Sequence, residues 1–321
     1  MTLDGNASVL LAYPIALAVT CVATPLARRL AARTGAIDHP NERKLHRAPI
    51  ATSGGVAIIA GFYAAAVISG AIHQVPLRVF LGLTAGAVFI AAVGFIDDRV
   101  DLPARVKLPL QILSAAPLLA AGVTISMLSH PLVRQSQLAL PLWVSWFITV
   151  IWVVAVTNAI NLIDGVDGLA SGVVAISSVA LAFIALQWGQ LGVALLCASL
   201  AGAAIGFLMW NWRPASILMG DTGAYFMGYI IAGVTIQGAF KMAAAIAIFV
   251  PLLILAVPLL DTILSPVRRI LRGQHPFKAD RDHLHHRLIA LGLSETRVVL
   301  LTYIITALCG AIAIWMSRVA R

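Results

Sequence analysis

The stretch WVVAVTNAINLIDGVDGLASGVVAISS, residues 152–178, joins two apolar runs through a short polar segment. The runs extend over about 142–160 and 169–187. As helices that rise about 1.5 Å per residue, both are long enough to cross a bilayer. The amides and acids between them are costly in apolar surroundings unless something uses them. The stretch therefore predicts two membrane helices joined by a functional turn.

Apolar runs of this kind recur along the whole chain, which is 60% hydrophobic and only 11% charged. A transmembrane barrel would instead alternate apolar and polar residues. We therefore predict a single all-α polytopic membrane domain over residues 1–321, with about ten transmembrane helices. Alternating pieces within 123–141 predict a small hairpin on the outer, periplasmic surface. The ten apolar segments are 7–27, 54–72, 77–96, 108–122, 142–160, 169–187, 191–210, 222–239, 242–264 and 298–317.

The charged residues divide unequally between the two faces of this arrangement. The links after odd-numbered segments carry 17 of the 22 Lys and Arg residues, which predicts that they are cytoplasmic and that both termini lie outside. This bias explains the net charge of +9 without a nucleic-acid partner. Twelve of the 13 acidic residues also lie on or beside that face, and topology does not explain them. The five links are about 28–53, 97–107, 161–168, 211–221 and 265–297.

The link GFIDDRVDLPARVK contains Asp97, Asp98 and Asp101 where the third segment meets the cytoplasm. Asp97 and Asp101 share a face if the helix continues, because they are four residues apart. Adjacent carboxylates repel each other unless a cation or a proton lies between them. They could hold Mg²⁺, or one could act as a base; ordinary solvated acids would also account for this link alone.

Two further acid clusters lie on the same face. Asn158, Asn161, Asp164 and Asp167 recur at every third residue and would form a polar stripe at a helix end. Asp221 lies between glycines in MGDTG, just before an apolar run. It could be a metal ligand with room for phosphates beside it, or the N-cap of a helix.

Two links are basic. HPNERKLHRAPIATSGG, residues 39–55, contains Lys44, and HPFKADRDHLHHRLIALG, residues 275–292, has the leucine spacing of a short amphipathic helix. Its cations suit a diphosphate, although they could also anchor the chain to anionic lipid. A zinc site would lack a cysteine partner. The candidate residues in the second link are Arg281, His283, His285 and His286.

All five clusters lie on one face, where apolar helices meet water. Several acids for Mg²⁺ together with several cations are typical of phosphoryl transfer, in which positioning and charge neutralisation supply most of the catalysis. The location suits a reaction between a water-soluble phosphate donor and a lipid phosphate.

The motifs DDRVD, NAINLIDGVDGLASG, MGDTG and HPFKADRDHLHHRL occur in that order, within a resemblance that covers the chain from about His39 to Gly292. Together they resemble the polyprenyl-phosphate N-acetylhexosamine-1-phosphate transferases. The last motif is similar to that of the undecaprenyl-phosphate GlcNAc-1-phosphate transferases. The resemblance implies transfer of a sugar-1-phosphate from a UDP-N-acetylhexosamine to polyprenyl phosphate. The favoured donor is UDP-GlcNAc. The reaction would depend on Mg²⁺, with Mn²⁺ as an alternative ion. The resemblance further implies release of UMP, a bacterial plasma-membrane location and a role at the first membrane step of cell-envelope glycan synthesis. A homodimer is compatible with it.

The resemblance also implies roles for individual residues. Asp97 and Asp98 would be acids near the lipid phosphate, Asp97 being the base, and Asp221 would be the principal Mg²⁺ ligand with Asn161. Two departures from the family pattern are Leu218, where an aromatic residue is common, and Ala224, where Ser is common. The residues assigned to substrate binding are Lys44, Lys107, Asn158, Asn161, Asp164, Asp167, Arg281, His283, His285 and His286.

Two other classes of function share parts of this pattern. An intramembrane prenyltransferase also uses aspartate-rich motifs and Mg²⁺, but it does not need the His/Arg link or the asparagine ladder. A lipid or solute transporter could have the same hydropathy, but its charged residues should lie near the middle of the membrane.

Overall fold

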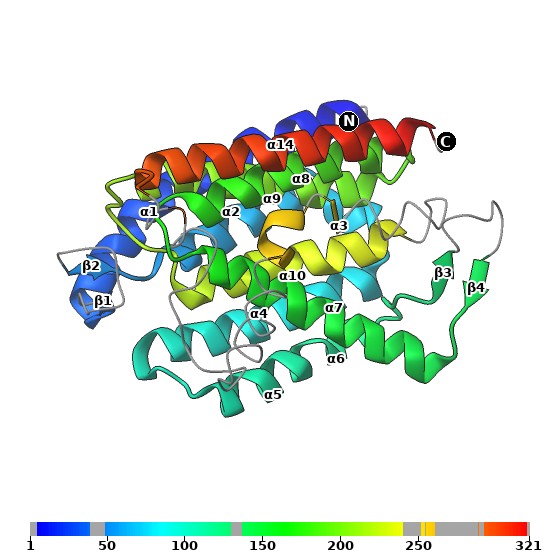
Figure 1. Cartoon of the computed structure of the whole chain (residues 1–321), viewed down its shortest axis with the longest axis horizontal. Helices are drawn as coiled ribbons and strands as arrows, with labels where there is room; N and C mark the ends of the chain where they lie inside the picture. The colour runs from blue at the N-terminus through cyan, green and yellow to red at the C-terminus, as the bar shows by residue number, and fades with distance from the viewer. Residues whose placement is uncertain are drawn as a thin grey trace.

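The computed structural model describes residues 5–38, 49–129, 137–239, 252–253, 255–260, 288 and 292–319. In Figure 1 its long helices run side by side, and they form one bundle. The first and last of them, α1 and α14, lie along the same side of the bundle. The long helices are α1 (Gly5–Thr34), α2 (Gly54–Ile68), α4 (Leu77–Val100), α7 (Leu142–Ile163), α8 (Leu169–Gln187), α9 (Leu191–Asn211), α10 (Gly220–Ala239) and α14 (Glu295–Val319).

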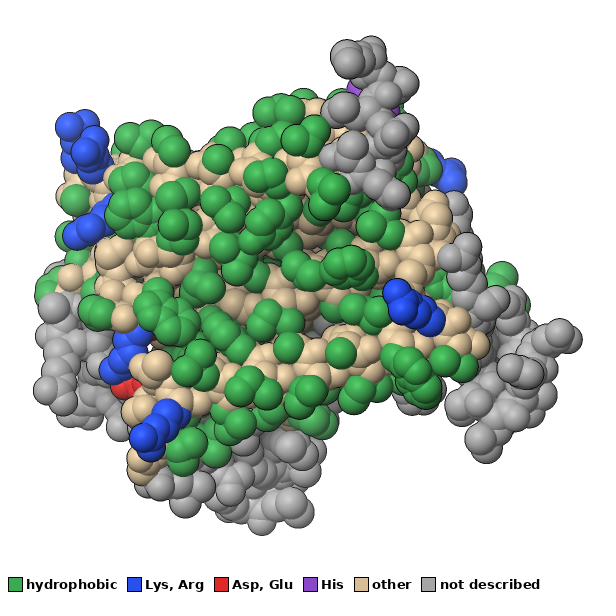
Figure 2. Space-filling view, turned by 90° about the horizontal axis from the view of Figure 1, so that it is seen from above, with side chains coloured by type: hydrophobic (Ala, Val, Ile, Leu, Met, Phe, Trp, Pro, Cys, Tyr) green, Lys and Arg blue, Asp and Glu red, His purple; other side chains and the backbone are tan. Residues whose placement is uncertain are grey.

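Within the described residues, six helices are long and apolar enough to cross a membrane. They are α1, α4, α7, α8, α9 and α14, which confirms the prediction of a helical membrane protein. Large apolar side chains such as Trp143 (73% exposed) and Trp315 (64% exposed) lie on the outside of the bundle. The face in Figure 2 is covered by hydrophobic side chains, with Lys and Arg at its margins. A surface of this kind is suited to lipid rather than water.

The predicted segment 108–122 is not one membrane helix. The structure has two helices there, α5 (Ala104–Ser114) and α6 (Ala116–Ala120), separated at Ala115. A further short helix, α3 (Ala71–Gln74), lies between α2 and α4 in the chain. Pro117 has no N–H, and its ring clashes with the carbonyl four residues earlier, so a continuous helix is disfavoured there. At 11 residues, α5 rises about 16 Å, roughly half of the hydrocarbon core. Most of the predicted segment 242–264 lies outside the described residues.

Helix α10 is the central element of the bundle. It packs against α4, α7 and α2, and Tyr225, Phe226, Tyr229 and Ile230 are almost fully buried. It is not among the six helices that are apolar enough to span, and its Tyr and Thr side chains are buried within the protein. Its position explains why a helix at the centre of a membrane protein can contain Tyr and Thr.

Two small hairpins lie at opposite ends of the bundle (Figure 1). Strands β3 (Met127–Ser129) and β4 (Gln137–Ala139) pair antiparallel, which confirms the hairpin predicted for 123–141. Strands β1 (Ile37–Asp38) and β2 (Ile50–Ala51) also pair antiparallel, a hairpin that the sequence did not predict.

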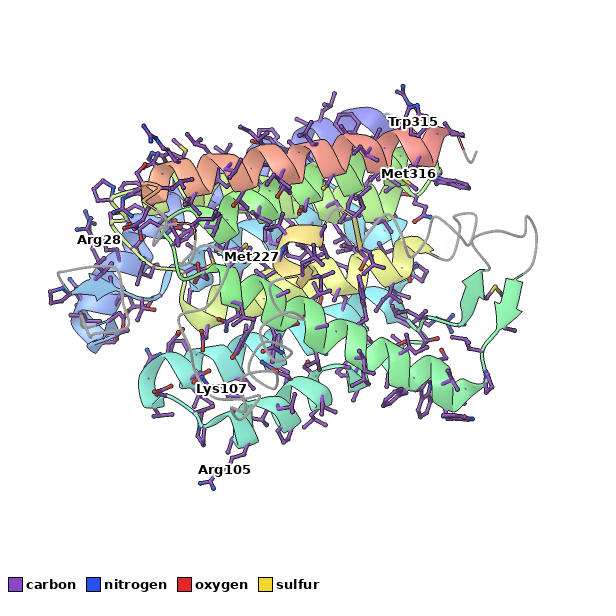
Figure 3. All side chains as sticks on the ribbon, in the orientation of Figure 1. Arg28, Arg105, Lys107, Met227, Trp315 and Met316 are labelled. Atoms are coloured by element: carbon purple, nitrogen blue, oxygen red, sulfur yellow. The ribbon has the colours of Figure 1, made fainter. Side chains whose placement is uncertain are left out.

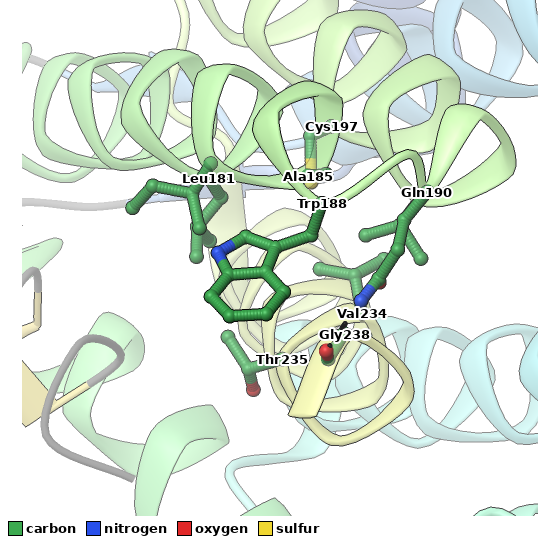
Figure 4. Close-up of a pocket in the computed structure, with 10 residues that line it drawn as sticks. Leu181, Ala185, Trp188, Gln190, Cys197, Val234, Thr235 and Gly238 are labelled. Atoms are coloured by element: carbon green, nitrogen blue, oxygen red, sulfur yellow. Dashed lines mark hydrogen bonds between the residues drawn. The ribbon is translucent and has the colours of Figure 1, made fainter. Parts of the chain in front are cut away.

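A small apolar pocket lies between the α8–α9 turn and the last turns of α10 (Figure 4). Trp188, Gln190 and Thr235 contribute to its lining, and Gln190 Nε2 donates a hydrogen bond to the carbonyl oxygen of Gly238 at 2.8 Å. The acidic motifs lie at the other end of these helices, so this pocket is not part of the candidate site.

Candidate active site

Four of the five predicted links meet at one end of the bundle, where β1 and β2 also lie. The start of α10 contacts both the end of α4 and the end of α7, through Asp98 and Asn161. Leu218 N donates to Ala51 O at 2.9 Å, which joins the 211–221 link to β2. In Figure 3, Lys107 and Arg28 lie toward this end, and Trp315 and Met316 lie toward the other. The sequence prediction that these links share one face is confirmed.

Lys107 is the cation at the centre of the acidic cluster. Its Nζ lies 2.7 Å from Asp97 Oδ2, 3.8 Å from Asp221 Oδ2 and 3.8 Å from Asp101 Oδ1. Burial opposes the charged form of Lys107, but the carboxylates of Asp97, Asp221 and Asp101 outweigh it and raise the pKa of the ammonium group. Lys107 is therefore a permanent positive charge between two candidate catalytic acids.

Asp97 is held on three sides, and its side chain is only 1% exposed. Its Oδ1 accepts a hydrogen bond from Leu102 N at 2.8 Å. Its Oδ2 contacts Lys107 and accepts a hydrogen bond from Tyr225 Oη at 3.3 Å. This arrangement fixes one carboxylate beside the cation at the end of α4. The sequence did not single out Tyr225, whose hydroxyl is a polar group within a mostly apolar run.

Asp221 faces Lys107 from the first turn of α10. Its Oδ1 accepts a hydrogen bond from Asn161 Nδ2 at 3.1 Å, and its Oδ2 faces the ammonium group of Lys107. Asn161 comes from the last turn of α7. Three helices thus contribute one polar side chain each to a single point, and Asn161 and Asp221, which the resemblance implied as Mg²⁺ ligands, are brought together there.

Asp98 has a different environment from Asp97. Its Oδ1 accepts a hydrogen bond from Asp221 N at 2.7 Å, and its Oδ2 accepts two from Thr222, from N at 3.2 Å and from Oγ1 at 2.7 Å. The two adjacent acids of DDRVD therefore point to different partners. Asp97 meets Lys107, and Asp98 meets the start of α10.

The last two members of the ladder lie in the turn between α7 and α8. Asp164 ends α7 and is partly buried, and burial together with the carboxylates of Asp221, Asp98 and Asp167 raises its pKa well above the usual range. Asp167 Oδ2 accepts a hydrogen bond from Ala215 N at 3.0 Å, which joins this turn to the 211–221 link. Among the described residues, Asp164 is therefore repelled by the carboxylates of Asp221, Asp98 and Asp167 at this end of the bundle.

Asn158 lies one turn deeper than Asn161 and is paired with a residue that the sequence analysis did not single out. Gln111 Nε2 donates to Asn158 Oδ1 at 3.1 Å, and Asn158 Nδ2 donates to Gln111 Oε1 at 2.7 Å. This reciprocal pair joins α5 to α7. A second missed amide is the buried Asn211, whose Oδ1 accepts from Gly168 N at 3.0 Å. In both cases the available signal was an amide within or beside an apolar run.

The predicted substrate-binding residues Lys44, Arg281, His283, His285 and His286 lie outside the described residues. The site described above therefore consists of the acids, the amides and Lys107.

Gly94 permits the close approach of α4 and α10 behind the site. A Cβ atom at this position would lie 2.6 Å from Asp221 C, Asp221 O and Thr222 N, which is closer than non-bonded atoms can come. We expect Gly94→Ala to push the start of α10 away and lower turnover about 100-fold, the scale of a 1 Å misplacement. Gly238→Ala is the matched control, because its Cβ would meet Gln190 Oε1 at an ordinary 3.6 Å. Equal turnover of the two variants would contradict this account of the packing.

Comparison with known proteins identifies the family. The profile of Glycosyl transferase family 4 matches residues 80–239, which include most of α4 and all of α7 and α10. A probable undecaprenyl-phosphate N-acetylglucosaminyl 1-phosphate transferase of Bacillus subtilis is 37% identical over 298 residues, covering 92% of this chain and 82% of the relative. The chain belongs to Glycosyl transferase family 4. The resemblance found in its motifs is thereby confirmed.

Other relatives match over similar lengths. A decaprenyl-phosphate N-acetylglucosaminephosphotransferase of Mycobacterium tuberculosis is 34% identical, with 89% of this chain and 77% of the relative covered. The undecaprenyl-phosphate alpha-N-acetylglucosaminyl 1-phosphate transferase of Escherichia coli is 28% identical, with 90% and 78% covered. The similarity to these transferases thus extends over about nine-tenths of the chain.

Proposed function

We propose that this protein transfers GlcNAc-1-phosphate from UDP-GlcNAc to a polyprenyl phosphate such as undecaprenyl phosphate, and releases UMP. The observation that carries the proposal is the cluster of Asp97, Lys107, Asp221 and Asn161 at one end of a membrane bundle, in a chain similar over most of its length to transferases of this name. The reaction would be the first membrane step in the synthesis of a cell-envelope glycan such as a teichoic acid or a lipopolysaccharide.

The proposed Mg²⁺ ion would be held by Asp221 and Asn161. Neighbouring ligands of an octahedral Mg²⁺ at about 2.1 Å lie roughly 3 Å apart. Asp221 Oδ1 and the Asn161 amide are separated by 3.1 Å, and turning that amide over would place its oxygen where its nitrogen lies. Within the described part of the chain, no three His, Cys, Asp or Glu residues converge as metal ligands. Two protein ligands completed by water and substrate phosphate are the usual arrangement for Mg²⁺.

The residues of the chain suggest how the transfer proceeds. Asp97 accepts the proton of the lipid phosphate, and an oxygen of that phosphate attacks the phosphorus that carries the sugar. The bond from this phosphorus to the bridging oxygen breaks, and UMP leaves with that oxygen and its electron pair. Lys107 offsets the phosphate charge between Asp97 and Asp221, while a bound Mg²⁺ would neutralise charge on the diphosphate. Asp164 and Asp167 would contact the uridine nucleotide, and Asn158 with Gln111 would border the site.

We further propose that this end of the bundle faces the cytoplasm of a bacterial cell, with both termini and the β3–β4 hairpin outside. The positive-inside bias of the links supports this orientation. About ten spans would follow if α2, α10, the α5–α6 pair and the 242–264 segment complete the six long helices. A homodimer is a further proposal.

The reaction can be tested by measuring UMP release from the purified protein in lipid. We expect release to require UDP-GlcNAc, polyprenyl phosphate and Mg²⁺ together, to stop on addition of EDTA, and to return with excess Mg²⁺ or, in part, Mn²⁺. A panel of UDP-sugars should show preference for GlcNAc. Turnover that survives complete removal of divalent ions would contradict the metal proposal. Dependence on a prenyl diphosphate in place of a UDP-sugar would indicate the prenyltransferase alternative.

A further inference from the structure

We infer that Asp98 is a positioning residue that holds the first turn of α10 and thereby directs Asp221 toward Lys107 and Asn161. In this assignment Asp98 does not contact the reacting atoms, although it is adjacent in sequence to the proposed base. The expected effect of Asp98 on turnover rests on the proposed function, whereas its capping of the α10 start does not.

The hydrogen bonds of Asp98 are those of a helix N-cap supplied from a distant part of the chain. The first amide groups of a helix have no partner within that helix, and a carboxylate near them is favourable. Asp98 accepts from the amides of Asp221 and Thr222, and also from the Thr222 hydroxyl. Asp98 and Asp221 are 123 residues apart, so this cap joins α4 to α10. Both carboxylate oxygens are engaged.

The residue before Asp221 leaves room for this contact. Gly220 has a φ of +69°, a conformation that favours glycine. A Cβ atom there would lie 2.5 Å from Asp98 Oδ2 and 2.7 Å from Asp98 Oδ1. Any larger residue would displace the carboxylate from the helix end. The approach of Asp98 thus explains why the first residue of the GDTG sequence, Gly220, is a glycine.

The consequence for the site follows from the position of Asp221. The residue whose amide binds Asp98 is the same residue whose carboxylate meets Asn161 and Lys107. A shift of the helix start by about 1 Å would disturb both contacts, and misplacements of this size cost about 100-fold in rate. Asp97 and Asp98 therefore have different roles. Asp97 faces Lys107, and Asp98 fixes the helix that carries Asp221.

Asp98→Asn and Asp98→Ala distinguish positioning from direct participation. Asn caps helices about as well as Asp. Its oxygen can accept from Asp221 N and its amide can donate to the Thr222 hydroxyl, so of the three hydrogen bonds only the one from Thr222 N is lost. We expect Asp98→Asn to keep turnover within about 5-fold of wild type and Asp98→Ala to lose about 100-fold. The Mg²⁺ concentration for half-maximal rate should rise only in Asp98→Ala. If the two variants lose turnover equally, Asp98 acts through its charge and the inference is wrong.

Hydrogen exchange at the start of α10 tests the cap without reference to turnover. The amide of Asp221 should exchange at least about 10-fold faster in Asp98→Ala and near the wild-type rate in Asp98→Asn, whereas the amide of Thr222 loses its acceptor in both variants. Ser294→Ala, which removes the serine whose Oγ accepts from Arg297 N at the start of α14, is the matched cap control and should leave turnover and the α10 amides unchanged. Unchanged exchange in Asp98→Ala would overturn the inference. If Asp98→Ala does not fold, Thr222→Val should accelerate this exchange and Thr222→Ser should not. A wild-type protein with no turnover but with this exchange pattern would reject the proposed function alone.

Discussion

Asp221→Asn should lower turnover about 1,000-fold while leaving the fold intact. The substitution keeps the size of the side chain but removes the charge of the proposed principal Mg²⁺ ligand, and metal neutralisation of phosphoryl charge contributes several kcal/mol to such reactions. The Mg²⁺ concentration for half-maximal rate should rise together with the loss of turnover. UMP release at several Mg²⁺ concentrations measures both effects.

The thermal stability of the same variant provides a second, independent test. Asp221 lies among carboxylates, and its repulsion contributes to the raised pKa of Asp164. Removing its charge in the absence of metal should therefore leave the thermal midpoint unchanged or higher, although most substitutions in a core lower it. Glu295→Gln is the control for the carboxylate-to-amide change; it weakens the ion pair with Arg213 and should leave turnover near wild type. A folded Asp221→Asn protein with wild-type turnover would exclude Asp221 as the principal ligand.

The sequence predicted the class of fold and the location of the site because both depend on regular physical patterns. Apolar length identified α4, α7, α8 and α9 to within a few residues at most ends, and the distribution of Lys and Arg placed the acidic links on one face. The contact of Asn161 with Asp221 shows that two of these links come together at this end of the bundle. These predictions required no knowledge of how the helices pack.

The sequence could not predict the features that depend on how the helices pack against one another. Hydropathy could not show that the 108–122 run is divided at Ala115, since that depends on Pro117 within an apolar stretch. The ladder spacing grouped Asn158 with Asn161, but the partner of Asn158 is Gln111 on another helix. Sequence adjacency likewise could not separate Asp97 from Asp98, because their different roles follow from which helix each one faces.

Lys107→Met should have the second large effect, lowering turnover about 1,000-fold and also destabilising the protein. Asp97 is 1% exposed and loses its cation in this variant, and breaking a buried ion pair in this way costs about 3–5 kcal/mol. The partial exposure of Lys107 places the expected loss near the lower limit. Thermal unfolding in detergent, together with UMP release, would measure both consequences. Lys107→Arg keeps the charge and should recover most of the stability but only part of the turnover, because a planar guanidinium does not replace a compact ammonium group.

The pH dependence of Lys107 has a definite sign. The pKa of its ammonium group is raised in the folded protein, so its stabilising contribution is fully present below the ordinary lysine pKa and is lost only as the pH rises through the raised value. Neither turnover nor stability should therefore fall between about pH 7 and 9 through deprotonation of this residue. A loss in that range that is present in wild type and absent in Lys107→Arg would contradict this assignment.

Combining Lys107→Met with Asp97→Asn separates the structural from the chemical role of this pair. Removal of both partners leaves no buried carboxylate at position 97 without its cation, so the thermal midpoint should return part of the way to that of wild type, although Asp221 still lacks the cation that it faces. Turnover should not return, because the double variant lacks both the proposed base and the cation that offsets the phosphates. If turnover recovers together with stability, the pair serves the fold alone, and the proton of the lipid phosphate must be accepted by another residue.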